Sequence, residues 1–183
     1  LGHMITAKFW QDVVDDGLHL TMAETGWAKC SWGKIYGQWI AGTAIFVYDY
    51  FGKFTPTDIL PLISKYKITT FCAPPTIYRF LCKEDLSHYD FSSITHCSTA
   101  GEALNPEVAK QFKDQTGLNI YEGFGQTEST VILATFKYMD IKQGSMGKPS
   151  PLYEIHLIDE DGNEVPRGEV GELAVKGPGV MTC

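Results

Sequence analysis

Apolar runs alternate with helix-like patterns along most of the chain. Short, largely apolar runs that are typical of strands lie at residues 18–22, 43–48, 68–72 and 94–98. Apolar residues at helical spacing predict helices at residues 8–15, 32–41, 57–66, 76–82 and 106–116. Because strands and helices alternate, we predict an α/β fold in which a mainly parallel sheet is flanked by helices. The run at 43–48 is apolar almost throughout, so we expect a strand buried on both faces.

The helix expected at 32–41 carries its large apolar side chains on one face, which predicts that the helix is buried. These side chains belong to Trp32, Ile35, Tyr36 and Trp39. We expect Trp32 and Trp39 in the core, together with Trp10.

The helix expected at 106–116 has clear start and stop signals. Asn105 can cap its first turn, and Pro106 suits the first helical position. Gly117 follows the last helical residue, where a left-handed residue commonly ends a helix.

The pattern changes near Gly144. Residues 154–158 alternate between polar and apolar, Asp161-Gly162 indicates a turn, and residues 171–176 alternate again. This predicts a separate antiparallel, barrel-like β segment. We therefore divide the chain into an α/β part at 1–140 and a β-rich part at 141–183, each a partial domain.

Composition narrows the class of protein. The chain has 183 residues, 44% of them hydrophobic and 20% charged, as is ordinary for a soluble globular protein. A net charge of −7 and the lack of a basic cluster argue against nucleic acid as a partner. No apolar run approaches the ~20 residues of a transmembrane segment. The chain opens on Leu1 rather than methionine, so we expect a piece of a longer sequence.

Cysteine and histidine supply no evident metal site. The five cysteines are odd in number and lack Cys-x-x-Cys spacing, which argues against a disulfide framework and indicates a reducing compartment. None of the five histidines has a nucleophile or metal partner nearby in the sequence, so we expect structural or surface roles. They are His3, His19, His88, His96 and His156.

Candidate chemistry is densest at residues 121–128, which hold two glycines, two side-chain donors and two carboxylates. Gln126 and Thr127 can donate hydrogen bonds to phosphate oxygens. Glu128 is an oxygen ligand of the kind that Mg²⁺ accepts beside substrate phosphates. Residues 121–128 therefore indicate a nucleotide site at the end of a strand, and the alternative is a polar turn between two strands.

Four other motifs accompany residues 121–128, at 25–27, 98–104, 144–149 and 168–173. In this order they resemble the adenylate-forming superfamily of acyl-CoA synthetases, peptide-synthetase adenylation domains and luciferases. Residues 122–128, with 18–20 and 34–39, look most like the acetyl- and medium-chain acyl-CoA synthetases. The resemblance covers essentially the whole chain.

This resemblance implies an enzyme that activates a carboxylic acid with ATP and Mg²⁺ and transfers the acyl group to CoA. It assigns Thr127 to the α-phosphate and the acyl carboxylate, and Glu128 to Mg²⁺, as the catalytic pair. The adenine would lie between two segments, one made of Gly101, Glu102 and Ala103 and the other of Glu122, Gly123, Phe124, Gly125 and Gln126.

The resemblance also implies an acyl pocket. Trp27 would form one of its walls. Acetyl-specific relatives carry a tryptophan at the position of Gly125, so this chain should leave the pocket floor open and admit acids longer than acetate.

The phosphate loop and the C-terminal lysine of the superfamily have no counterpart here. We therefore expect an internal fragment that is inactive alone. Two alternatives stay open: an adenylation domain that serves a carrier protein, and a non-catalytic nucleotide-binding module that is complete as it stands. The expected location is the cytoplasm, or the mitochondrial matrix in a eukaryote, and a homo-oligomer stays open.

Overall fold

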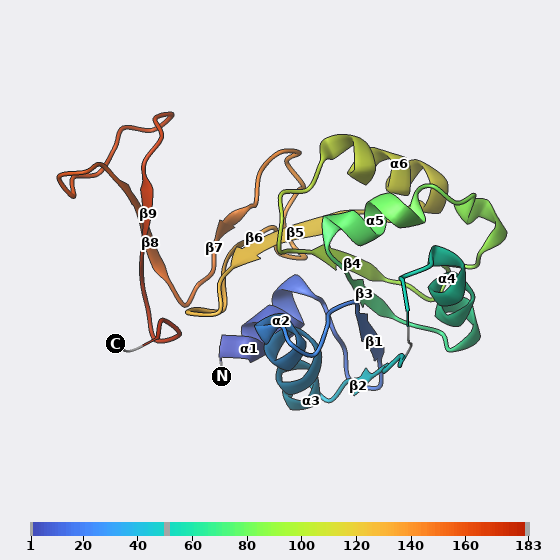
Figure 1. Ribbon diagram of the computed structural model, residues 1–183. Helices are drawn as coiled ribbons and strands as arrows, with labels where there is room; N and C mark the ends of the chain where they lie inside the picture. Colours follow the sequence, from blue (N-terminus) through green and yellow to red (C-terminus); the bar gives the residue numbers. More distant parts are fainter. Residues whose placement is uncertain (1, 50–51, 182–183) are drawn as a thin grey trace.

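The computed structural model describes residues 2–49 and 52–181, and its centre is a seven-stranded sheet (Figure 1). The strand order is β2 (Ala44–Ile45), β1 (Leu18–Thr21), β3 (Thr70–Cys72), β4 (His96–Thr99), β5 (Ile120–Gly125), β6 (Val131–Ala134) and β7 (Lys148–Pro149). Neighbours from β2 to β5 pair in parallel, whereas β6 and β7 pair antiparallel. The predicted α/β fold with a mainly parallel sheet is confirmed.

Helices cover both faces of this sheet (Figure 1). One side carries α4 (Pro56–Lys65), α5 (Pro75–Leu81) and α6 (Pro106–Thr116), with a short 3₁₀ helix at Leu86–His88. The other side carries α1 (Gly2–Ile5), a π-helical stretch at Thr6–Trp10, α2 (Ala28–Cys30), a second π-helical stretch at Ser31–Tyr36, and α3 (Gly37–Ile40). Successive side chains of a strand point to opposite faces of the sheet. In β3, Phe71 accordingly joins the core on the α4–α6 side, and Cys72 packs with Trp10 on the other side.

Local signals predicted α6 correctly. The Asn105 side chain accepts a hydrogen bond from the Glu107 backbone N–H at 2.8 Å, and Gly117 ends the helix with a φ of 76°. Both features satisfy backbone groups that a helix end leaves without partners. The strand runs at 18–22, 68–72 and 94–98 and the helices at 57–66 and 76–82 are also found, with ends displaced by one or two residues.

The helix expected at 8–15 is wrong in its position. The helical segment spans residues 2–10, and residues 11–15 are irregular. Asp12 has a φ of 50° and Asp16 a φ of 60°. Such left-handed backbone cannot continue a right-handed helix, and aspartate tolerates it better than most residues do.

The helix expected at 32–41 exists as part of a longer helix at 28–40, but its orientation was predicted wrongly. Tyr36 is 56% exposed and Trp39 is 60% exposed, so Trp39 is not a core residue. The Trp32 side chain lies outside the described part. Over residues 33–38 the buried residues are instead Gly33, Gly37 and Gln38. With no side chain at Gly33, the helix comes close enough for the Gly33 carbonyl to accept from the Thr21 hydroxyl of β1 at 2.9 Å.

The run at 43–48 was also predicted wrongly. Only Ala44–Ile45 form a strand, and this strand, β2, lies at the edge of the sheet beside β1 alone. Ala44 is exposed and Ile45 is half-buried, so the run is not covered on both faces. Its apolar character therefore does not indicate a central strand.

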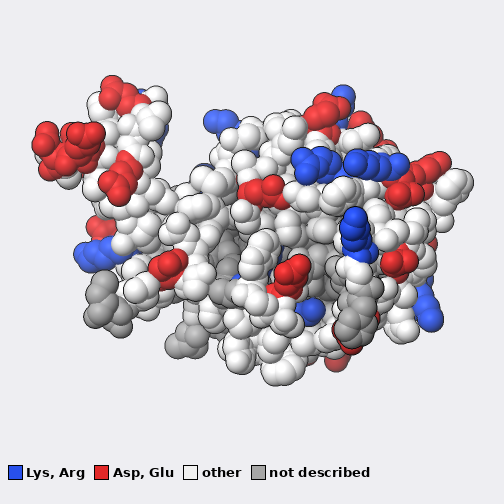
Figure 2. All heavy atoms as spheres, viewed as in Figure 1, with Lys and Arg blue, Asp and Glu red and all other residues white. Residues whose placement is uncertain are grey.

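The tail forms a separate antiparallel pair, as predicted. β8 (Glu154–Ile158) pairs with β9 (Glu172–Lys176), and the hairpin projects from the main body (Figure 1). Acidic side chains gather at its far end, where residues 159–161 are exposed (Figure 2). β7 lies beyond residue 140 and still belongs to the large sheet, and the division at 140/141 stays a prediction. Within the described residues, no helix has the length and apolarity that a membrane crossing requires.

Candidate functional site

Two loops leave neighbouring strands at the same edge of the sheet. β4 and β5 are parallel, with Thr99 opposite Glu122, so the segments that follow both strands emerge on one side. In open α/β sheets this carboxyl edge is where ligands bind. β5 continues to Gly125, so most of residues 121–128 is strand, and only residues 126–128 occupy the exposed turn.

The loop after β4 is fixed by contacts from the rest of the fold. The Thr99 hydroxyl donates to the Ala73 carbonyl at 2.8 Å, and Lys29 Nζ donates to the Ala100 carbonyl at 3.1 Å. Gly101 then has a φ of 106°, and nothing lies within 4 Å of the place where a Cβ would stand. The backbone of Gly101 is therefore open on the side from which a ligand could approach.

Glu102 completes this loop by capping a helix. Its Oε1 accepts hydrogen bonds from the backbone N–H of Thr76 at 2.9 Å and from the Thr76 hydroxyl at 2.5 Å. Thr76 lies in the first turn of α5, where backbone N–H groups lack partners within the helix. The hydrogen bonds from Thr76 lower the pKa of Glu102, so its carboxylate is charged at neutral pH.

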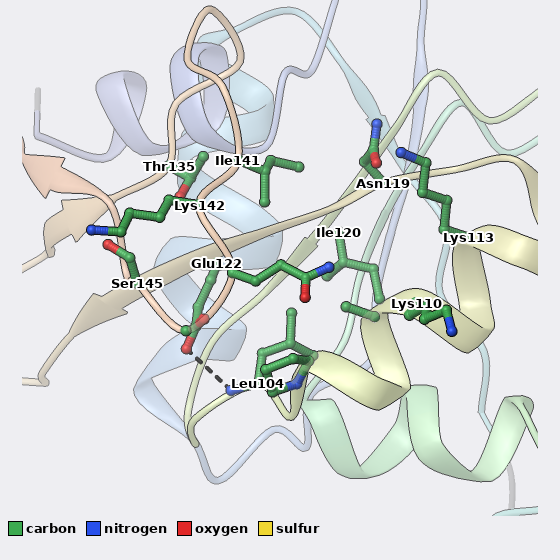
Figure 3. A pocket seen from close by; sticks show the side chains of 14 residues that line it. Leu104, Lys110, Lys113, Asn119, Ile120, Glu122, Thr135, Ile141, Lys142 and Ser145 are labelled. Atoms are coloured by element: carbon green, nitrogen blue, oxygen red, sulfur yellow. Dashed lines mark hydrogen bonds between the residues drawn. The ribbon is translucent and has the colours of Figure 1, made fainter.

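Glu122 joins the two strand ends. It is only 9% exposed, and its Oε1 accepts a hydrogen bond from the backbone N–H of Leu104 at 3.1 Å (Figure 3). Burial raises the pKa of Glu122, and the Leu104 hydrogen bond opposes this. A carboxylate on β5 thus holds the far end of the β4 loop.

Glu122 also lines a cavity of about 160 Å³ between β5, α6 and the loop at 141–145. Lys110 and Lys113 come from α6, and Lys142 and Ser145 come from the loop opposite (Figure 3). The remaining lining residues are Leu104, Pro106, Ala109, Asn119, Ile120, Thr135, Ile141, Gln143 and Gly144. Of the site residues predicted from sequence, only Glu122 lines this cavity. The motif at 144–149 includes the end of the loop, but no local pattern indicates that the loop faces Glu122.

Close packing explains two of the glycines on β5. A Cβ at Gly123 would come within 2.6 Å of the Trp10 indole, whose Nε1 donates to the Tyr121 carbonyl at 3.1 Å. A Cβ at Gly125 would overlap the carbonyl oxygen of Thr130, which directly precedes β6, where the β5–β6 pairing shifts register. Both positions therefore need glycine for contacts within the fold. Phe124 between them is half-buried.

The turn after β5 is held by backbone hydrogen bonds and by the Ser129 hydroxyl, which accepts from the Gln126 N–H at 3.3 Å. The Gln126 carbonyl accepts from the Ser129 N–H at 3.2 Å, and the Glu128 carbonyl accepts from the Met181 N–H at 2.7 Å. The side chains of Gln126, Thr127 and Glu128 are exposed, and none hydrogen-bonds to another described residue. Donors and a carboxylate are thus presented together at the sheet edge.

Glu128 fits Mg²⁺ as a single carboxylate rather than as part of a cage. No group of three or more histidine, cysteine, aspartate or glutamate residues within the described ranges could hold a metal ion. Mg²⁺ keeps several waters and is commonly bound by one or two carboxylates together with substrate phosphates. The exposed Glu128 carboxylate beside the Thr127 hydroxyl suits that mode of binding.

Trp27 and two of the histidines lie outside the segments at 100–104 and 121–128. Trp27 precedes α2 and is 52% exposed, so about half of its surface is available for contact. His19 is buried, with Nδ1 2.7 Å from the Thr70 hydroxyl and Nε2 2.6 Å from the Thr21 hydroxyl. Burial lowers the pKa of His19 to about 3, which keeps it neutral. His96 contacts the Trp10 carbonyl at 2.8 Å. These two histidines are structural.

A family model described as AMP-binding enzyme matches residues 4–183. The chain belongs to the AMP-binding enzyme family. Among curated relatives in this family, it is 44% identical over 176 residues to the mitochondrial acyl-coenzyme A synthetase ACSM3 of Rattus norvegicus, covering 96% of this chain and 30% of that protein. It is 42% identical over 176 residues to the mitochondrial acyl-coenzyme A synthetase ACSM4 of Homo sapiens, with the same coverage of 96% and 30%.

Solved structures of family members have the same fold. The acyl-CoA synthetase of Brucella canis superposes with a TM-score of 0.88 at 26% identity, over 94% of this chain and 32% of that one. A benzoate CoA ligase of Burkholderia xenovorans LB400 gives 0.83 at 30% identity, over 95% and 35%. The chain therefore spans about a third of the length of these relatives. The resemblance expected from the sequence motifs is confirmed.

Proposed function

We propose that this chain is the part of an AMP-forming acyl-CoA synthetase that holds the adenine and the acyl group during activation of a carboxylic acid. The observation that carries the proposal is the exposed turn at 126–128, whose free donors and carboxylate lie at the same sheet edge as the open backbone of Gly101. The names of the curated relatives agree with this class of reaction.

The roles of the turn residues follow from the chemistry of adenylation. A carboxylate attacks the α-phosphorus of ATP as pyrophosphate leaves, so negative charge accumulates on oxygens that need fixed donors. Thr127 would donate its hydroxyl to the α-phosphate and to the acyl carboxylate. Glu128 would hold Mg²⁺, which when bound neutralises charge on the phosphate oxygens. Gln126, exposed beside Thr127, offers a further donor.

The adenine would lie across the two strand ends. Gly101, Glu102 and Ala103 are exposed and would cover one of its faces, and residues 122–126 the other. Glu122 fixes the separation of the two segments through its hydrogen bond to Leu104. Trp27 would bound the acyl group. CoA, rather than a carrier protein, is proposed as the acceptor because the curated relatives are acyl-coenzyme A synthetases. A location in the cytoplasm or the mitochondrial matrix would suit four buried free cysteines.

The decisive experiment uses the intact enzyme that contains this chain. We expect exchange of pyrophosphate into ATP that depends on both a carboxylic acid and Mg²⁺, and then a thioester when CoA is added. The isolated chain of 183 residues serves as a comparison and is expected to give no exchange. ATP binding without acid-dependent exchange in the intact protein would favour a non-catalytic nucleotide-binding module. Transfer to a carrier-protein thiol but not to CoA would favour an adenylation domain.

A further inference from the structure

Tyr153 joins the β8–β9 hairpin to the turn that carries Thr127 and Glu128. It directly precedes β8 and is only 7% exposed. Its hydroxyl oxygen accepts a hydrogen bond from the backbone N–H of Thr130 at 3.1 Å and lies 2.6 Å from the Thr130 hydroxyl. A phenol has one O–H to donate and lone pairs to accept, so the Tyr153 side chain serves both polar groups of Thr130.

Thr130 marks the end of the turn and is itself tightly held. It directly precedes β6 and is 6% exposed. Its carbonyl accepts from the Ser129 hydroxyl at 3.0 Å and approaches Gly125, the last residue of β5, closely enough to exclude a Cβ there. The N–H and the hydroxyl of Thr130 are buried against Tyr153. Tyr153 therefore takes the place that water would have as the partner of both groups.

Two glycines that follow β9 leave room for the Tyr153 ring. A Cβ at Gly177 would come within 2.6 Å of the ring carbon Cδ1, and a Cβ at Gly179 would overlap the Tyr153 hydroxyl oxygen. The same segment also reaches the turn directly, since the Met181 N–H donates to the Glu128 carbonyl at 2.7 Å. The base of the hairpin thus contacts the segment at 126–130 from two sides and lies beside the junction of β5 and β6 (Figure 1).

The side chains of Thr127 and Glu128 are exposed and make no hydrogen bond to another described residue, so the backbone of the turn sets where they point. Displacing a reacting group by about 1 Å can cost on the order of 100-fold in rate. We propose that Tyr153 is a positioning residue, whose hydroxyl fixes the end of the turn and so holds Thr127 and Glu128 in their reactive orientation. This rests on the proposed function, since it assumes that adenylation takes place at the turn.

The first test is Tyr153→Phe in the intact enzyme, because this change removes only the hydroxyl. We expect kcat of acid-dependent pyrophosphate exchange to fall about 10-fold, with little change in KM for ATP or for the acid, since the turn acts mainly in the transition state. Tyr78→Phe is the matched control. Tyr78 is buried in the α4–α6 core, where its hydroxyl donates to the Ser98 carbonyl at 3.0 Å, and its loss should leave kcat unchanged.

Thr130 allows the same contact to be weakened from its other side. Thr130→Val keeps the shape of the side chain and removes its hydroxyl, so kcat should fall by a smaller factor because the Thr130 N–H still binds Tyr153. Thr130→Ser keeps the hydroxyl and should retain most of the rate. Normal kcat in both Tyr153→Phe and Thr130→Val would overturn the proposal, and so would a raised KM with kcat unchanged.

A double variant separates positioning from a general loss of stability. If Tyr153 acts through Thr127, Tyr153→Phe should lower the rate by a smaller factor in the Thr127→Ala enzyme than in the wild type, because the donor that it positions is already gone. The same factor in both backgrounds would show that Tyr153 acts independently of Thr127, and the proposal would fail.

The two proposals can fail separately. If no acid supports exchange in the wild type, the proposed function fails. Amide hydrogen exchange then still measures the contact, since it needs no activity: protection of the Thr130 N–H should fall about 10-fold in Tyr153→Phe and should not change in Tyr78→Phe. Unchanged protection of Thr130 in Tyr153→Phe would refute the role of Tyr153 even if acid-dependent exchange is observed.

Discussion

The loops that follow β4 and β5 lie at one sheet edge but are built differently. The β4 loop is tied to the rest of the fold at three points: Lys29 donates to the Ala100 carbonyl, Thr76 donates to Glu102, and the Leu104 N–H donates to Glu122. Residues 126–128 hydrogen-bond to other described residues through their backbone groups, including the Gln126 N–H to the Ser129 hydroxyl, and their side chains are exposed. The loop after β4 is therefore fixed by hydrogen bonds to the rest of the fold, whereas the turn after β5 presents exposed side chains to a ligand. Substitutions in the two loops should affect different measurements.

The largest effect on rate is expected at Thr127. Thr127→Ala in the intact enzyme should slow acid-dependent exchange by ~10²–10³, because it removes a donor to charge that develops in the transition state. The Thr127 side chain is exposed and makes no hydrogen bond to another described residue, so the Tm should not change. Thr127→Ser keeps the hydroxyl and should recover most of the rate. A normal rate in Thr127→Ala would show that residues 126–128 are only a turn.

Local chemistry made part of this arrangement predictable from sequence. The cap at Asn105 and the left-handed Gly117 act within a few residues of themselves, so α6 was predicted almost to the residue. Residues 121–128 stood out because glycines, donors and carboxylates occur together there. These signals require no knowledge of distant parts of the chain.

What could not be predicted depends on long-range contacts. The run at 43–48 looked like a central strand, but the strand order places β2 at the edge. Tyr36 and Trp39 share an apolar face, yet both are exposed, and Gly33 and Gly37 are buried instead. The contact of Lys29 with the Ala100 carbonyl spans 71 residues, so no local pattern predicts it. Pattern alone does not reveal which face meets which neighbour.

The next largest effect is expected at Gly125, where β5 joins the turn. A Cβ there would overlap the Thr130 carbonyl oxygen, so Gly125→Ala should cost about 1–3 kcal/mol of unfolding free energy, as overpacking does. Gly26→Ala is the matched control, since nothing lies within 4 Å of its Cβ position. Urea unfolding of both variants provides the measurement.

The close approach of the Thr130 carbonyl to Gly125 also changes how acyl specificity should be tested. Gly125→Trp would disturb the backbone as well as fill the predicted pocket floor, so a loss of long-chain activity in that variant could arise from strain alone. A shift of preference toward acetate with kcat retained would still support the open floor at Gly125. Equal stability of Gly125→Ala and Gly26→Ala would contradict the packing explanation.

A smaller effect, of opposite sign, is expected at Glu122. Its pKa is raised in the folded state by burial, so the charged form lowers stability at neutral pH. Glu122→Gln keeps an acceptor for Leu104 and removes the charge, and should raise the unfolding free energy at neutral pH by up to about 1 kcal/mol. The difference should shrink as the pH falls below the ordinary value of 4.5, where the wild-type carboxyl is neutral in both states. A variant less stable than wild type at every pH would show that the Leu104 bond requires the carboxylate.

The smallest effect is expected at Glu102, which lies in the loop after β4 and is largely exposed. Its folded-state pKa is lowered, mainly by the hydrogen bonds from Thr76, so its stabilising contribution is present above the ordinary pKa of 4.5 and is lost as the pH falls through the lowered value. Glu102→Ala removes this cap from α5 and should cost about 0.5–1 kcal/mol at neutral pH, at the low end for caps because solvent screens the site. Glu102→Gln keeps an acceptor for Thr76 and should cost less. Unfolding free energies at neutral and acid pH test this directly, because the alanine variant and the wild type should converge at acid pH. If Glu102→Ala slows exchange strongly without loss of stability, Glu102 acts on the ligand. The contrast between a structural loop after β4 and a ligand-binding turn at 126–128 would then fail at this residue.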